Sequence, residues 1–188
     1  MIASLLGYFL LVVFFAMELF LRRGGAARTL KAGLSDRGTT NLIGLSYGVG
    51  ILLPPILNYF SIGAFPAAGR VGGLGVLLML TGLGMRGWSM HALGRYYTRT
   101  LLISEEQSII KEGPYRIIRH PGYFGTLLVM IGLAVAQANW IATGLVAGLL
   151  MVAYHRRMNA EEAMLTAAFG DLYRSYQEHT WRLLPRVY

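Results

Sequence analysis

Cysteine is absent from this chain of 188 residues, and charged residues are scarce. The absence of cysteine excludes disulfides, thiolate metal ligands and a cysteine nucleophile, and we expect no metal site. Charged residues make up 14% of the chain, where a soluble domain has about 25%, and hydrophobic residues make up 55%. A chain this apolar cannot cover itself with polar surface in water, so we expect one membrane domain covering residues 1–188.

Five apolar stretches follow one another and predict an all-α integral membrane fold with about five transmembrane helices. They are Ile2–Leu21, Leu42–Ile62, Val71–Leu93, Tyr123–Ala136 and Trp140–Tyr154. The first three have roughly the 20 residues that cross the hydrocarbon core. The last two are shorter and are joined only by Gln137-Ala138-Asn139, which predicts a tight antiparallel hairpin. Pro54-Pro55 should kink or break the second stretch.

Glycine is abundant, with 24 residues, and much of it lies in the second to fifth stretches. Small residues let helix backbones approach closely in a membrane, so we expect most of these glycines to serve helix packing. Gly82-Leu83-Gly84 belongs to this group on physical grounds, because a lone Gly-x-Gly within a helix is weak evidence for a ligand site.

The positions of the basic residues predict the orientation in the membrane. The net charge is +8, and 15 of the 17 Lys and Arg residues lie in three alternate segments. The first segment joins stretches one and two, the second joins stretches three and four, and the third follows stretch five. Basic residues favour the cytoplasmic side, so we expect a multi-pass protein with its N-terminus outside and its C-terminus in the cytoplasm. The positive charge then needs no nucleic acid to explain it.

The cytoplasmic connection Gly94–Gly122 is about 29 residues long, and loops of this length are usually functional. Many of its residues are apolar or aromatic, so we expect it to pack on the bundle as a lid or pocket wall. Near its end, Pro121 keeps His120 out of the helical region just before the fourth helix. His120 then lies at a helix N-terminus, where unpaired backbone N–H groups favour an anion. An interfacial belt of Tyr, Arg and His is an equal alternative.

The segment Asn159–Tyr176 has apolar residues at helical spacing and predicts an amphipathic C-terminal helix. Asn159 is a suitable N-cap, and Glu162 completes a capping box, which gives Glu162 a structural role. Glu161 is then left for a ligand, or serves only as an anion at a helix N-terminus. If the fifth helix continues into this segment, Arg157 and Glu161 share one face and suit a zwitterionic ligand. Arg157 alternatively anchors the helix at the lipid headgroups.

Two blocks of residues carry a family resemblance. The first runs from Gly113-Pro114-Tyr115 through Arg119-His120-Pro121-Gly122-Tyr123-Phe124-Gly125. The second runs from Arg157 through Glu161-Glu162, Leu165, Phe169-Gly170, Tyr173 and Tyr176 to Thr180, Arg182 and Pro185. In this order and at this separation, they resemble the isoprenylcysteine carboxyl methyltransferase family, over residues from about Leu80 to the end. The related phospholipid N-methyltransferases share a Gly-x-Gly and a Glu-Glu pair, which Gly82/Gly84 and Glu161/Glu162 match.

The resemblance implies an enzyme that uses S-adenosyl-L-methionine to methylate a lipophilic acceptor, with the carboxylate of a prenylated cysteine as the first choice. Residues 94–188 would form the cofactor-binding half, and residues 1–93 would form three N-terminal spans. The implied cofactor contacts are Gln107, Ser108, Ile109, Ile110, Tyr115, His120, Pro121, Gly122, Tyr123 and Glu161. Arg157 would position the acceptor carboxylate, and membrane lipids would surround the protein.

Methyl transfer to a carboxylate needs no strong base, because the acceptor is already ionised at neutral pH. The protein would contribute alignment and the exclusion of water. Other acceptors remain open, namely a phospholipid amine or a small thiol, as does a nicotinamide-dependent, sterol-type membrane reductase. A non-enzymatic transporter or assembly factor would need polar groups buried within the spans, and only Arg86 and His91 approach that description.

Overall fold

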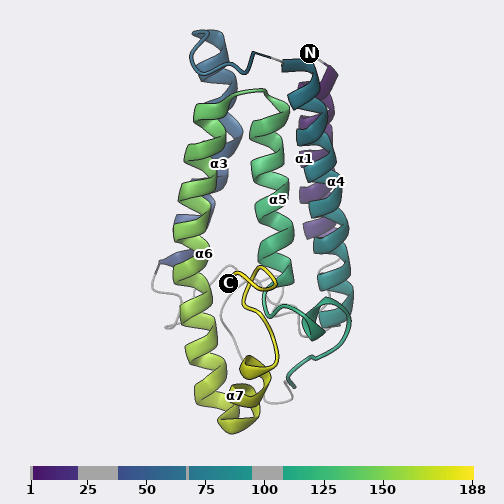
Figure 1. Ribbon diagram of the computed structural model, residues 1–188, viewed down its shortest axis with the longest axis vertical. Helices are drawn as coiled ribbons and strands as arrows, with labels where there is room; N and C mark the ends of the chain where they lie inside the picture. Colours follow the sequence, from purple (N-terminus) through teal and green to yellow (C-terminus); the bar gives the residue numbers. More distant parts are fainter. Residues whose placement is uncertain (1, 21–37, 67, 95–107) are drawn as a thin grey trace.

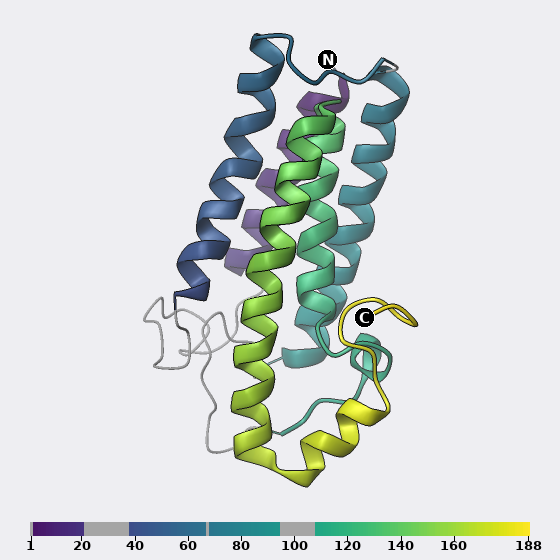
Figure 2. The ribbon, with the colours of Figure 1, turned by 60° about the vertical axis from the view of Figure 1, so that its left-hand side comes forward.

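The computed structural model describes residues 2–20, 38–66, 68–94 and 108–188. Five long helices lie side by side in an elongated bundle, with the short helix α7 below one end (Figure 1), and a second view shows the same arrangement (Figure 2). They are α1 (Ile2–Phe20), α3 (Thr39–Tyr59), α4 (Ala68–Leu93), α5 (Pro121–Ala136) and α6 (Trp140–Phe169), followed by α7 (Asp171–Glu178). A 3-10 helix, η3 (Gly113–Arg116), precedes α5. The described residues contain no strand, only two isolated β-bridges, so the all-α prediction is confirmed.

Three of the five expected spans are helices long and apolar enough to cross a membrane, namely α1, α3 and α4. Helix α5 is also apolar but has only 16 residues, and α6 is apolar only in its first half. The count of five spans therefore stays a prediction. The α5–α6 hairpin is present, and Asn139 caps α6 by accepting a 2.9 Å hydrogen bond from the N–H of Ala142. Helix α3 is not broken at Pro54-Pro55, since both prolines lie inside it.

The C-terminal amphipathic helix does not begin where the sequence suggested. Helix α6 runs without interruption from Trp140 to Phe169, so Asn159 lies inside a helix and is not an N-cap. The backbone turns at Gly170, whose φ of 54° lies in the left-handed region that glycine adopts without strain. Helix α7 follows and buries Tyr173 and Tyr176. The continuity of α6 matters for the site, because it carries the apolar span and the charged residues on one rigid element.

Glycine allows α4 and α5 to pack backbone against backbone. A Cβ on Gly82 would lie 2.6 Å from the carbonyl oxygen of Gly125, and one on Gly132 would lie 2.8 Å from that of Gly75. Real Cβ atoms essentially never come so close, so these four positions require glycine. Gly84 differs, because a Cβ there meets nothing within 4 Å. The packing role predicted for Gly82-Leu83-Gly84 is therefore correct for Gly82 and wrong for Gly84.

Other glycines also depart from the expectation of close packing. A Cβ would meet open space within 4 Å at Gly44, Gly48, Gly69, Gly73, Gly144 and Gly148. In α4, Gly69 and Gly73 alternate with the packed Gly72 and Gly75, and the sequence alone does not distinguish the two groups. The distinction depends on which face of each helix meets a neighbour.

A buried ion pair lies in the bundle at the end nearer α7. Arg86 of α4 donates from Nε to Glu18 Oε1 of α1 over 2.6 Å, and both side chains are largely buried. Nearby, the hydroxyls of Tyr47 on α3 and Tyr154 on α6 lie 3.0 Å apart. Polar groups buried in a membrane protein are costly unless they are paired, so these contacts connect α1 with α4 and α3 with α6 at this end.

Candidate functional site

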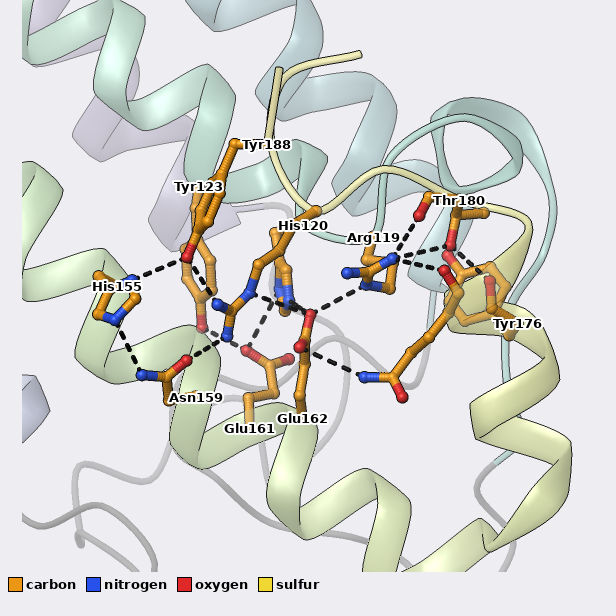
Figure 3. Close-up of polar contacts among 12 residues, drawn as sticks. Arg119, His120, Tyr123, His155, Asn159, Glu161, Glu162, Tyr176, Thr180 and Tyr188 are labelled. Atoms are coloured by element: carbon orange, nitrogen blue, oxygen red, sulfur yellow. Dashed lines mark hydrogen bonds and ion pairs between the residues drawn. The ribbon is translucent and has the colours of Figure 1, made fainter. Parts of the chain in front are cut away.

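Ionisable and aromatic side chains gather where α5 begins and where α6 leaves the bundle (Figure 3). His120 and Tyr123 come from the start of α5, whereas Arg157, Glu161 and Glu162 come from α6. Because α6 is continuous here, Arg157 and Glu161 share a face, as the sequence predicted for that case. Packing of α5 against α6 thus brings the two sequence blocks together.

The hydroxyl of Tyr123 lies between Glu161 and Arg157. It donates a hydrogen bond of 2.7 Å to Glu161 Oε2 and accepts one of 3.3 Å from Arg157 Nε. Arg157 Nη1 also donates to the hydroxyl oxygens of Thr39, at 3.0 Å, and Thr40, at 3.4 Å. Arg157 is only 3% exposed, and this burial argues against a simple anchor at the lipid headgroups.

His120 and Tyr123 form the aromatic side of the site. Their rings stack with centroids 5.4 Å apart, and Tyr123 stacks in turn on Tyr154 at 5.0 Å. His120 is buried, with Nε2 3.0 Å from Glu162 Oε1 and Nδ1 3.7 Å from Glu161 Oε2. Its backbone is non-helical, with φ −123° and ψ 54°, as expected for a residue before proline. The histidine ring therefore links both glutamates of α6 to the start of α5.

Glu162 is the centre of an ion-pair network and not a helix cap. Its carboxylate accepts hydrogen bonds from Arg119 Nε at 3.0 Å and Gln177 Nε2 at 3.3 Å, and it pairs with His120 and with Arg182 Nε at 3.3 Å. The predicted capping box is wrong, because α6 continues through this region and bonds the backbone N–H groups itself. Burial alone would raise the pKa of Glu162, but the hydrogen bonds and charges of His120 and Arg119 lower it to about 2.

The low pKa of Glu162 predicts a loss of stability in acid. A carboxylate whose pKa is lower in the folded state contributes stability that is complete above its usual pKa of 4.5 and disappears as the pH falls towards about 2. Glu162→Gln should lower the free energy of unfolding at neutral pH by about 2 kcal/mol, because Arg119 and Arg182 lose their anion and His120 loses a charged hydrogen-bond partner. The difference from wild type should shrink as the pH falls below 4.5. Thermal unfolding of both proteins in detergent, at a series of pH values, measures this difference in stability. A difference independent of pH would contradict the role of the Glu162 carboxylate in the ion-pair network.

The C-terminal segment holds the first sequence block from a second side. Trp181 donates its backbone N–H to Ile117 O over 2.9 Å, and its carbonyl accepts from the N–H of Arg119 at 2.8 Å. The guanidinium of Arg119 also donates to the backbone oxygens of Gln177 and Thr180. Arg119 therefore has a structural role, because it bonds both α6 and the C-terminal segment. The residues before α5 are held by α6 on one side and by the chain beyond α7 on the other (Figure 3).

A second polar cluster, formed by His155, Asn159, Arg182 and Tyr188, connects the C-terminal residues to α6. Arg182 donates from Nη2 to Asn159 Oδ1 at 2.5 Å and from Nη1 to the hydroxyl of Tyr188 at 2.6 Å. That hydroxyl also lies 2.7 Å from His155 Nδ1. Because Arg182 pairs with Glu162 as well, this cluster and the ion-pair network are continuous.

Three further residues that were predicted to contact the cofactor, Tyr115, Pro121 and Gly122, pack against other parts of the protein. Tyr115 is buried in η3, and its carbonyl accepts a 2.7 Å hydrogen bond from the hydroxyl of Tyr176. Pro121 is buried in the first turn of α5. Gly122 packs against α4, since a Cβ there would lie 2.7 Å from Arg86 Nη1. These residues shape and hold the signature segment, and their proposed contact with a cofactor stays a prediction.

Some predicted residues are not joined to the site, and some site residues were not predicted. Ser108–Ile110 form no hydrogen bond with the His120–Glu162 cluster in the part of the chain that is described, and Gln107 lies outside that part. Arg119 was not predicted as a site residue, although it belongs to the first sequence block that resembles the family. Thr39 lies 118 residues from Arg157, in no motif, and only the packing of α3 against α6 reveals it.

The arrangement suits a ligand or ligands that carry both signs of charge. The side chain of Glu161 is 28% exposed, which leaves its carboxylate accessible to a cation. His120 and Tyr123 lie beside it, with His120 Nδ1 3.7 Å and the Tyr123 hydroxyl 2.7 Å from Glu161 Oε2. Arg157 supplies a guanidinium, which can hold a carboxylate. Among the described residues, no group of three or more His, Asp or Glu side chains is placed to hold a metal ion.

Several known proteins resemble this chain. The model of the isoprenylcysteine carboxyl methyltransferase family matches residues 75–167. A probable protein-S-isoprenylcysteine O-methyltransferase of Oryza sativa is 29% identical over 116 residues, which are 61% of this chain and 61% of the relative. Protein-S-isoprenylcysteine O-methyltransferase B of Arabidopsis thaliana is 26% identical over 184 residues, which are 95% of this chain and 91% of the relative.

A solved structure shares the fold. The eukaryotic intramembrane Ras methyltransferase, an isoprenylcysteine carboxyl methyltransferase, matches with a TM-score of 0.67 at 21% identity. The match covers 78% of this chain and 53% of that chain. The chain thus spans about half the length of the solved protein, and 61% of the length of the rice relative. The region that the family model matches contains His120, Tyr123, Arg157, Glu161 and Glu162.

Proposed function

Because the chain belongs to the isoprenylcysteine carboxyl methyltransferase family, we propose that it is a membrane enzyme that methylates a lipophilic carboxylate. The proposed methyl donor is S-adenosyl-L-methionine, and the proposed acceptor is the carboxylate of a prenylated cysteine. The observation that carries this proposal is the placement of Arg157 and Glu161 on one face of α6, with Tyr123 between them. A guanidinium for the acceptor and a carboxylate for a cationic donor then stand one helical turn apart.

The chemistry needs few protein groups. The donor, when bound, supplies a methyl group on a sulfonium, and transfer to a carboxylate oxygen forms one C–O bond, breaks one C–S bond and moves no proton. Arg157 would hold the acceptor carboxylate and orient one oxygen, and alignment of this kind can supply several kcal/mol of the barrier reduction, on the order of 7–11 for well-oriented reactions. Arg157 and His120 are buried, and this burial supports the proposal because a site that excludes water would favour the transfer.

The residues of the site fit such a donor. Glu161 would balance its positive charge or bind its ribose hydroxyls, and His120 and Tyr123, which both contact Glu161, would lie beside it. The buried Tyr115, Pro121 and Gly122 would hold the segment that surrounds it. We keep Gln107 and Ser108–Ile110 as proposed contacts of its adenosine part, which the resemblance alone supports.

Calorimetric titration of the detergent-purified protein tests the class of enzyme. Saturable binding of S-adenosylhomocysteine without binding of NADPH is expected, whereas binding of NADPH alone would indicate a reductase and binding of neither a non-enzyme. Glu161→Gln should weaken S-adenosylhomocysteine binding, because a charged contact in a partly buried site is worth about 1–3 kcal/mol. Glu178→Gln, at an exposed glutamate at the end of α7, is the matched control and should leave binding unchanged.

Methylation assays then test the class of acceptor. N-acetyl-S-farnesylcysteine should be methylated as its carboxylate, whereas phosphatidylethanolamine and a small alkyl thiol should not be methylated at a comparable rate. Preference for the amine or the thiol would assign the chain to another acceptor class while leaving the methyl donor unchanged.

We propose that the site faces the cytoplasm and that the N-terminus lies outside. In support, the described basic residues outside α4 all belong to segments at the end of the bundle away from the N-terminus of α1 (Figure 1). They are Lys111, Arg116, Arg119, Arg156, Arg157, Arg174, Arg182 and Arg186. Reporters fused at Tyr188 and inserted between Gly63 and Arg70 should therefore label opposite sides of the membrane. Labelling of one side by both would contradict this orientation.

A further inference from the structure

Arg157 and Glu161 carry opposite charges four residues apart on one helix. Such pairs lie close enough to attract each other into a direct ion pair. Here the hydroxyl of Tyr123 lies between them, donating to Glu161 Oε2 at 2.7 Å and accepting from Arg157 Nε at 3.3 Å. One phenol from α5 therefore bonds both charged groups of α6 at once.

Tyr123 is itself held in place by its neighbours. Its ring stacks between His120, with centroids 5.4 Å apart and planes inclined by 16°, and Tyr154, at 5.0 Å and 19°. Tyr154 is 1% exposed, and its own hydroxyl lies 3.0 Å from that of Tyr47 on α3. A ring stacked on both faces has little freedom to tilt, so the position of its hydroxyl is determined by α5 and α6 together.

Hydrogen bonds to described residues hold the guanidinium of Arg157 at two of its nitrogens, Nε and Nη1. Tyr123 accepts from Nε, and Thr39 accepts from Nη1 at 3.0 Å. Two bonds to neighbouring nitrogens of a planar group define the plane of that group. Loss of the contact at Nε removes the one described bond that both orients this edge of the guanidinium and separates it from the carboxylate one turn away.

We infer that Tyr123 is a positioning residue that separates Arg157 from Glu161 and thereby keeps the guanidinium oriented for the acceptor carboxylate. This inference rests on the proposed methyl transfer to a carboxylate. Without the hydroxyl, Glu161 loses a hydrogen-bond donor and Arg157 loses an acceptor, and the two charges move together. The acceptor carboxylate must then compete with Glu161 for the same guanidinium.

Tyr123→Phe should therefore act mainly on the acceptor. At saturating S-adenosyl-L-methionine, kcat/KM for N-acetyl-S-farnesylcysteine should fall about tenfold or more, with most of the loss in KM for the acceptor. Affinity for S-adenosylhomocysteine should change less than about fivefold. The matched control is Tyr154→Phe, which removes a hydroxyl from the same stack that contacts Tyr47 and neither charged residue. Its KM should stay within about twofold of wild type.

A second substitution distinguishes competition from simple damage. Adding Glu161→Gln to Tyr123→Phe removes the competing charge, so KM for the acceptor should recover by at least about threefold relative to Tyr123→Phe alone. Recovery of this kind, which a collapsed or unfolded site does not give, supports the inference. Equal KM values in Tyr123→Phe and Tyr154→Phe, or a double variant no better than Tyr123→Phe, would overturn it while leaving the methyltransferase proposal intact. A wild-type protein that binds S-adenosylhomocysteine but methylates no carboxylate would overturn both.

Discussion

Arg157→Lys is expected to lower methyl transfer to a carboxylate acceptor at least about tenfold while leaving S-adenosylhomocysteine affinity within about threefold. The guanidinium of Arg157 donates in two directions, from Nε to Tyr123 and from Nη1 to Thr39 and Thr40. Lysine has a single point charge and cannot make this set of bonds or hold a carboxylate in a bidentate way. The acceptor would lose its alignment, whereas the proposed donor contacts at Glu161 would remain.

The neighbouring arginine provides the control for this substitution. Arg156 carries the same charge one residue earlier on α6, but it is exposed, whereas Arg157 is 3% exposed. Arg156→Lys should therefore leave both turnover and binding unchanged. Rates with N-acetyl-S-farnesylcysteine and calorimetric affinities are measured on the same purified proteins. Full turnover in Arg157→Lys would contradict a role in holding the acceptor, and an equal loss of binding and turnover would place Arg157 at the donor.

Gly82→Ala is expected to destabilise the protein by about 3 kcal/mol or more, although it adds a single methyl group. The new Cβ would lie 2.6 Å from the carbonyl oxygen of Gly125 and 2.8 Å from the backbone nitrogen of Val129. Backbone atoms cannot move aside as a flexible side chain does, so α4 and α5 must separate. Because Gly125 lies two residues after Tyr123, separation would also displace the start of α5 from α6, and activity should fall with stability.

Gly84→Ala is the matched control for the packing argument. Gly84 lies two residues further along the same helix, and a Cβ there meets nothing within 4 Å. Alanine favours a helix over glycine by about 0.5–1 kcal/mol, so this variant should be as stable as wild type or slightly more so. Thermal unfolding in detergent compares the two substitutions directly. Similar melting temperatures for both would contradict the close contact of α4 with α5.

The apolar stretches and the charge distribution were readable from the sequence because both are local properties. Four of the five apolar runs became helices within three residues of their expected bounds, for example α5, expected over Tyr123–Ala136 and observed over Pro121–Ala136. The fifth begins at Trp140 as expected but continues to Phe169. Pro121 also kept His120 non-helical, since the restriction acts between adjacent residues. Helical spacing alone placed Arg157 and Glu161 on one face, once α6 proved continuous.

The role of Glu162 could not be predicted from the sequence. A Ser, Thr, Asn or Asp residue followed three positions later by Glu is a sound local signal for a helix start, yet α6 passes through Asn159 without a break. Glu162 instead meets Arg119, His120 and Arg182, which arrive from two distant segments. The capping-box pattern did not start a helix here, because packing against the signature segment and the C-terminal residues stabilises a longer helix.

The sequence by itself therefore determined that this chain forms apolar helices, that its basic charge lies in alternate connections, and that Arg157 and Glu161 share a face where the helix is continuous. The part of these two residues in the chemistry stays a prediction. Only the tertiary structure decided that Gly82 packs while Gly84 does not, that Thr39 binds Arg157, and that Tyr123 stands between Arg157 and Glu161. The physical reason is the same in each case. Helix formation depends on neighbours within a few residues, whereas these contacts depend on how far one helix is rotated and shifted against another, and that register is set by the packing of the whole bundle.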